Sequence, residues 1–96
     1  MYKVADSEDI EILQSIIEDA GFDHYNYTGR GKNTECVAFT VGQDTTERAA
    51  IADLIDACQG DIERTETLAH ALRLSEIDGM GRGTVLYFPN YVTGDA

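Results

Sequence analysis

Residues 22–41 read FDHYNYTGRGKNTECVAFTV, and this stretch predicts the centre of the fold. Aromatic or β-branched residues recur at alternate positions within residues 22–28 and again within residues 34–41, which is the period of a β-strand. The five residues between these segments, GRGKN at 29–33, combine glycine with polar side chains and predict a turn. The stretch therefore predicts an antiparallel β-hairpin, which Gly42 closes.

Apolar residues at helical spacing predict three helices around this hairpin. One covers about residues 8–20 and ends at Gly21, and the others cover about residues 44–58 and 61–74. Residues that cap helix N-termini stand at the three starts, namely Asp6 or Ser7, Asp44 or Thr45, and Asp61. The residues expected to face the core are Ile10, Leu13, Ile16, Ile17 and Ala20, then Ala50, Ile51, Leu54, Ile55 and Cys58, and finally Leu68, Ala69 and Leu72 with Thr65 between them.

The remaining segments complete the expected topology. Residues 2–5 are a weak candidate for a first strand, residues 79–83 (GMGRG) predict a flexible loop, and residues 84–88 predict a final strand. Pro89 suits the end of that strand or a sheet edge, and residues 93–96 predict a loose tail.

The fold class that follows is a single α+β domain over residues 1–96. Its expected element order is (β)-α-β-β-α-α-β, with a small antiparallel sheet of three or four strands and helices packed on one face. If residues 2–5 form a strand, this order approaches a ferredoxin-like fold with an additional helix.

Charge is the strongest functional signal in the sequence. Eighteen acidic residues stand against seven basic ones, which gives a formal net charge of −11. Such a field attracts basic partners and opposes binding to nucleic acid and to anionic membranes. The acids are also ordered along the expected helices, with Glu8, Glu11, Glu18 and Asp19 on one side of the first, Asp53 and Asp56 on the second, and Glu63 and Glu66 on the third.

Sequence features that would indicate secretion, a membrane or a disulfide framework are weak. No apolar run approaches the ~20 residues of a transmembrane helix, and the first residues lack the apolar segment of a signal peptide. These features predict a cytoplasmic location. We interpret the two cysteines, Cys36 and Cys58, as small buried hydrophobic residues.

The motifs that suggest chemistry do not match their templates. The GRGK segment at 29–32 lacks the spacing of a phosphate-binding loop, and the GMGRG segment leads into a strand instead of a helix. His24, His70 and the two cysteines have no metal-ligand spacing. His70 follows Glu66 by four residues, which predicts an exposed pair on one helix. We therefore expect no catalytic set, no metal and no cofactor.

The first functional hypothesis is a non-enzymatic acidic module that binds a basic, nucleic-acid-binding protein surface. Helix-borne carboxylates would replace phosphates there, so the protein would act as an inhibitor and nucleic-acid mimic. In this character alone it resembles phage-encoded anti-restriction and anti-CRISPR inhibitors. The expected partner-binding residues are Glu8, Glu11, Glu18, Asp19, Asp53 and Asp56, with Tyr25, Tyr27, Arg30 and Lys32 as secondary candidates.

The alternative hypothesis is a small housekeeping domain whose acids serve solubility or salt adaptation. Such a domain could form a homodimer through an open edge of its sheet. The strand tyrosines fit either hypothesis, because they can be interface anchors or can pack half-buried against the helices. They are Tyr25, Tyr27, Tyr87 and Tyr91.

Overall fold

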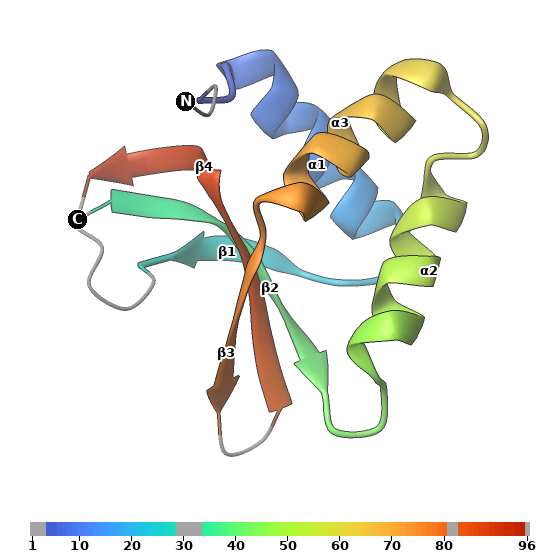
Figure 1. The fold of residues 1–96 in the computed structure, drawn as a ribbon, viewed down its shortest axis with the longest axis vertical. Coiled ribbons are helices and arrows are strands. Elements are labelled where there is room, and N and C mark those ends of the chain that lie inside the picture. Colours follow the sequence, from blue (N-terminus) through green and yellow to red (C-terminus); the bar gives the residue numbers. More distant parts are fainter. Residues whose placement is uncertain (1–3, 29–33, 81–82, 96) are drawn as a thin grey trace.

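The computed structural model describes residues 4–28, 34–80 and 83–95. Within these ranges a four-stranded antiparallel sheet carries three helices packed against it, as the sequence predicts (Figure 1). The spatial strand order is β1-β2-β4-β3. Along the chain the elements are α1 (Ser7–Asp19), β1 (His24–Tyr27), β2 (Thr34–Gly42), α2 (Glu47–Ala57), α3 (Ile62–Arg73), β3 (Glu76–Met80) and β4 (Gly83–Asp95).

The helices begin where a side chain can satisfy a free backbone N–H group. Asp6, Thr46 and Asp61 each accept a hydrogen bond from the backbone nitrogen three residues further on, over 2.9 to 3.1 Å. The caps of α1 and α3 are those that the sequence predicts, whereas the α2 cap expected at Asp44 or Thr45 is wrong. The N–H of Thr45 is used in a turn to the carbonyl of Gly42, so the helix begins later.

The sheet buries side chains on both faces. Toward the helices, alternate residues of β2 and β4 form the main core with the apolar stripes of α1, α2 and α3. The other face carries a smaller cluster of Cys36, Ala38, Val85 and Tyr87, against which Tyr27 packs. We call this the open face. Cys36 and Cys58 are both buried, as predicted.

Two helices bury a set of residues that differs in part from the expected one, although Ala50, Leu54, Cys58 and Leu68 lie in the core as predicted. In α2, Ile55 was expected to be buried, but its side chain is 55% exposed. In α3, Thr65 and Ala69 are exposed, and Thr67 and Ala71 are buried in their place. The buried face of α3 is rotated relative to the predicted one because this helix packs against α1 as well as against the sheet.

The loop expected at residues 79–83 is wrong at three of its positions, because Gly79 and Met80 end β3 and Gly83 begins β4. Residues 81 and 82 lie outside the described residues. Gly83 pairs with Met80 on one side and with Gly42 on the other. Its φ of +148° and its close approach to the Val41 carbonyl both require a residue without a side chain. The sequence does not predict strand β3, because its residues, EIDGM, lack the alternation of apolar and polar side chains that is typical of a half-buried strand.

Strand β4 is longer than the sequence suggests, and residues 93–95 belong to it instead of to a loose tail. Pro89 lies inside this central strand, not at its end or at an edge. It is tolerated because the register with β2 shifts there: Val37 pairs with Phe88, but Cys36 pairs with Val92. Residues 89–91 therefore bulge out of the ladder, where a missing N–H group costs little.

The expected first strand at residues 2–5 is not found in its described part. Val4 and Ala5 have no strand conformation, and Tyr2 and Lys3 lie outside the described residues. The N–H of Ala5 instead donates one hydrogen bond of 2.9 Å to the carbonyl of Asn90, in the bulge of β4. The described chain thus has the order α-β-β-α-α-β-β and lacks the leading strand of a ferredoxin-like arrangement.

Candidate functional site

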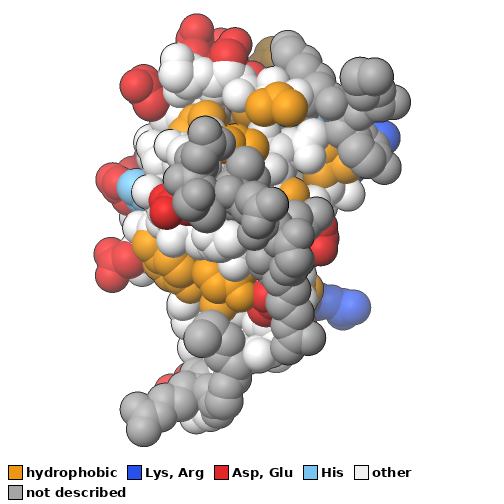
Figure 2. All heavy atoms as spheres, turned by 90° about the vertical axis from the view of Figure 1, so that its left-hand side faces the viewer, with side chains coloured by type: hydrophobic (Ala, Val, Ile, Leu, Met, Phe, Trp, Pro, Cys, Tyr) orange, Lys and Arg blue, Asp and Glu red, His pale blue; other side chains and the backbone are white. Residues whose placement is uncertain are grey.

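The outer surface of the helical layer concentrates the acidic side chains. Ten acidic and three basic residues lie on α1, α2 and α3. In Figure 2 many of the visible acidic side chains lie along one margin of the molecule, with others near the centre and toward the opposite margin, where the visible Lys or Arg side chains lie. Seven of the helix carboxylates are exposed and make no hydrogen bond or ion pair with another described residue: Glu8, Glu11, Glu47, Asp53, Asp56, Glu63 and Glu66. We call these seven the free carboxylates.

Glu18, a predicted partner-binding residue, contacts its own chain. Its Oε1 atom lies 2.7 Å from Nε2 of His24, at the start of β1. This pair joins the C-terminal end of α1 to the sheet edge, and both residues border a shallow hollow with Gly21, Phe22 and Asp23. The Glu18 carboxylate is therefore less available to a partner than the free carboxylates are.

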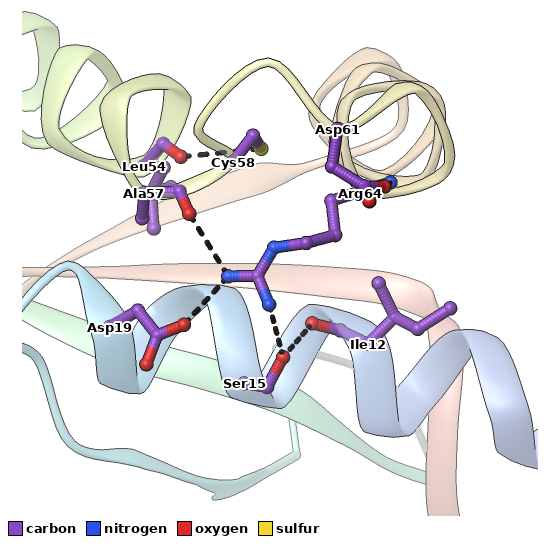
Figure 3. A network of polar contacts seen from close by, with 8 residues as sticks. All are labelled: Ile12, Ser15, Asp19, Leu54, Ala57, Cys58, Asp61 and Arg64. Carbon is purple, nitrogen blue, oxygen red and sulfur yellow. Dashed lines mark hydrogen bonds and ion pairs between the residues drawn. The ribbon is translucent and has the colours of Figure 1, made fainter.

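Asp19, the next predicted binding residue, belongs to a polar network centred on Arg64 (Figure 3). One guanidinium nitrogen of Arg64 donates to Asp19 Oδ2 over 2.8 Å and to the Ala57 carbonyl over 3.1 Å. The other donates to Ser15 Oγ over 3.1 Å. One arginine thus links all three helices, and the Asp19 charge is neutralised within the protein.

A second meeting point of α1 and α3 is a hollow of about 180 Å³. It is lined by Ala5, Asp9, Glu66, Thr67, His70 and Tyr91. The expected exposed pair between His70 and Glu66 is wrong, since His70 is half-buried and its Nδ1 atom lies 3.0 Å from the Tyr91 hydroxyl. The tertiary structure therefore places carboxylates of α1 and α3 around one hollow.

The buried phenol of Tyr91 is held in its neutral form. Burial, and to a smaller extent the negative charges of Asp9 and Asp6, raise the pKa of Tyr91 to about 12. Its hydroxyl donates to the carbonyl of Thr67 over 3.2 Å.

The tyrosines on the open face are turned toward their own sheet. Tyr27 donates to Asp78 Oδ2 over 2.5 Å, and Tyr87 donates to Glu76 Oε1 over 3.1 Å. Burial and the neighbouring carboxylate of Glu76 raise the pKa of Tyr87 to about 12. Tyr25, at the exposed margin, hydrogen-bonds Thr40 over 2.6 Å. These contacts favour packing over partner binding for Tyr27 and Tyr87.

Two of the secondary candidates, Arg30 and Lys32, lie outside the described residues. In the part of the chain that the structure describes, no three His, Cys, Asp or Glu side chains are placed to hold a metal ion. None of the described helices combines the length and the apolar character that a membrane span requires.

Sequence reasoning missed the roles of Asp9, Arg64 and Tyr91. A signal for Arg64 exists, because it stands three, four and seven residues before the buried positions 67, 68 and 71. That spacing places its guanidinium on the inward stripe of α3. Nothing comparable points to Tyr91, whose position depends on the bulge in β4.

The chain was compared with protein-family models, with curated proteins and with solved structures, and none of the three comparisons gave a match.

Proposed function

We propose that this protein is a non-enzymatic binding module that presents helix-borne carboxylates to a basic, nucleic-acid-binding protein surface and so inhibits it. The observation that carries this proposal is the set of seven free carboxylates on three helices that pack on one side of a single sheet. Carboxylates without internal partners keep their full capacity to accept hydrogen bonds from arginine and lysine.

The internal ion pairs reduce the number of residues that we propose to contact the partner. Glu18 and Asp19 already have a histidine and an arginine partner, so we assign the main role to Glu8, Glu11, Asp53 and Asp56. Glu63 and Glu66 extend the same charge over α3. A net charge of −11 would accelerate the encounter with a basic partner and make it salt-sensitive, and it opposes direct binding to a phosphate backbone.

The first experiment compares two triple variants that lose the same charge. One changes Glu8→Gln, Glu11→Gln and Asp53→Asn on the helical layer, and the other changes Asp23→Asn, Glu35→Gln and Asp44→Asn outside the helices. Proteins retained from host lysate at moderate salt are identified by mass spectrometry. The purified captured protein is then tested for nucleic-acid binding with and without the acidic protein.

We expect the parent and the second variant to capture a basic protein and to block its nucleic-acid binding, whereas the helical variant loses at least roughly tenfold in affinity. Equal capture by both variants would contradict the proposal, as would a captured protein that still binds nucleic acid in the complex. Thermal melting separates the salt-adaptation alternative, since a protein that folds only in molar KCl would support that reading instead.

A further inference from the structure

The hollow between α1, α3 and the bulge of β4 is large enough to receive a side chain. Its volume of about 180 Å³ is well above the ~15 Å³ that a single water molecule requires. Asp9 contributes from the first turn of α1, Glu66 and His70 from successive turns of α3, and Tyr91 from β4. Three elements that are distant in the sequence therefore form its walls.

The hydrogen bonds at the base of the hollow determine which histidine nitrogen carries a proton. The single hydroxyl proton of Tyr91 is donated to the Thr67 carbonyl, because a carbonyl can only accept. The hydroxyl oxygen must then accept from Nδ1–H of His70, 3.0 Å away. In the neutral imidazole the other nitrogen, Nε2, has no proton and is an acceptor.

The polar groups left over in this hollow are all acceptors. They are the carboxylates of Asp9 and Glu66 and the Nε2 atom of His70, and none has a hydrogen-bond partner among the described residues. No described lysine or arginine lines the hollow. Asp9, Glu66 and His70 are not arranged as a metal site. The chemistry that matches three acceptors of net negative charge is a compact cation with several N–H donors.

We propose that this hollow receives the ammonium group of a lysine side chain from the basic partner. A lysine ammonium has three N–H donors for the acceptors that line the hollow, and its aliphatic stem suits the apolar wall at Ala5. This inference rests on the proposed function and adds to it the anchor residue of the partner. Without such an anchor, the acidic surface would bind basic proteins through charge alone.

The test uses capped hexalysine as the probe and measures its affinity by fluorescence anisotropy at low salt. Asp9→Asn and Glu66→Gln remove a pocket carboxylate from α1 and from α3. Glu8→Gln and Glu63→Gln are matched controls, because each removes the same charge from the same helix outside the hollow. We expect each pocket variant to lose about tenfold in affinity, equivalent to about 1.4 kcal/mol. Each control should lose only about two- to threefold, because it belongs to the acidic surface but does not contact the ammonium group.

A second measurement tests directly whether the probe binds in the hollow. In the parent protein, hexalysine should shift the side-chain NMR signals of His70 and Tyr91, and Glu66→Gln should need about tenfold more probe for the same shifts. Equal losses in pocket and control variants, or unshifted ring signals, would overturn the pocket while leaving the proposed acidic surface intact. That surface fails separately if the helical triple variant captures its partner as well as the parent does. Denaturation midpoints confirm that each variant is folded.

Discussion

At the scale of single residues, the charged side chain of Arg64 connects the three helices. It stands on the buried side of α3 and reaches Ser15 and Asp19 on α1 and the last turn of α2. An exposed ion pair contributes little to stability, but the Arg64 side chain is only 24% exposed and its guanidinium donates to three acceptors. Its Nε atom is buried and has no acceptor among the described residues, so the network is not fully satisfied.

We predict that Arg64→Ala lowers the free energy of unfolding by about 1–3 kcal/mol, because it leaves partly buried acceptors without donors. Arg64→Met should recover part of this loss, since it keeps the packing of the stem. Arg73→Ala is the matched control, as Arg73 is exposed on the same helix, and should change stability by less than about 0.5 kcal/mol. Urea denaturation measures all three variants, and equal effects of the two alanine variants would refute the role of the network.

At the scale of elements, the β3–β4 hairpin depends on backbone geometry more than on side chains. Gly83 begins β4 at a φ of +148°, and a Cβ atom placed there would lie 2.5 Å from the Val41 carbonyl oxygen. Gly79, four residues earlier in β3, has open space around its Cα atom. Glycine is therefore required at one end of the hairpin and only tolerated at the other.

We predict that Gly83→Ala destabilises the protein by at least about 2 kcal/mol, because it adds a left-handed backbone strain to a clash with rigid backbone. Gly79→Ala should cost less than about 1 kcal/mol or slightly stabilise the strand. Thermal and urea denaturation of the two variants side by side check this difference. The hairpin geometry would be wrong if both substitutions had the same effect.

At the scale of the whole molecule, the protein buries one phenol on each face of its sheet. Tyr91 lies on the helix side and Tyr87 on the open face, and both are almost fully buried. The pKa of each is raised from its ordinary value of 10.0 to about 12, mainly by burial. Each face of the sheet therefore contains one phenol, and the two phenols lose their protons in the same pH range.

We predict that the two phenols add no pH dependence to stability below about pH 10 and lower the stability from there to about pH 12. In that window the unfolded chain releases phenolic protons that the folded protein retains, so the free energy of unfolding decreases by about 1.4 kcal/mol per pH unit for each phenol. Tyr87→Phe should lose about 1 kcal/mol at pH 8 with its hydrogen bond to Glu76, and should show about half the slope. Urea denaturation between pH 8 and 11.5 measures this, and an unchanged slope in Tyr87→Phe would contradict it.

Short-range sequence patterns determined much of the secondary structure of this protein. The caps at Asp6 and Asp61, the period of the hairpin strands and the stop at Gly21 depend on neighbours within a few residues, so the sequence alone predicts them. The α+β class and the outward position of Asp53 and Asp56 follow from the same short-range periodicities. The net charge that motivates the proposed function is a sum over residues and needs no structure at all.

Tertiary structure alone decided which of these groups meet. The bulge at residues 89–91 turns Tyr91 toward His70, and the packing of α1 against α3 brings Asp9 and Glu66 to one hollow. Strand β3 forms because its backbone pairs with that of β4; its own residues do not favour a strand. His70 and Tyr91 are 21 residues apart, and Asp9 and Glu66 are separated by still more of the chain. Local propensity carries no information about which distant side chains a fold will bring together.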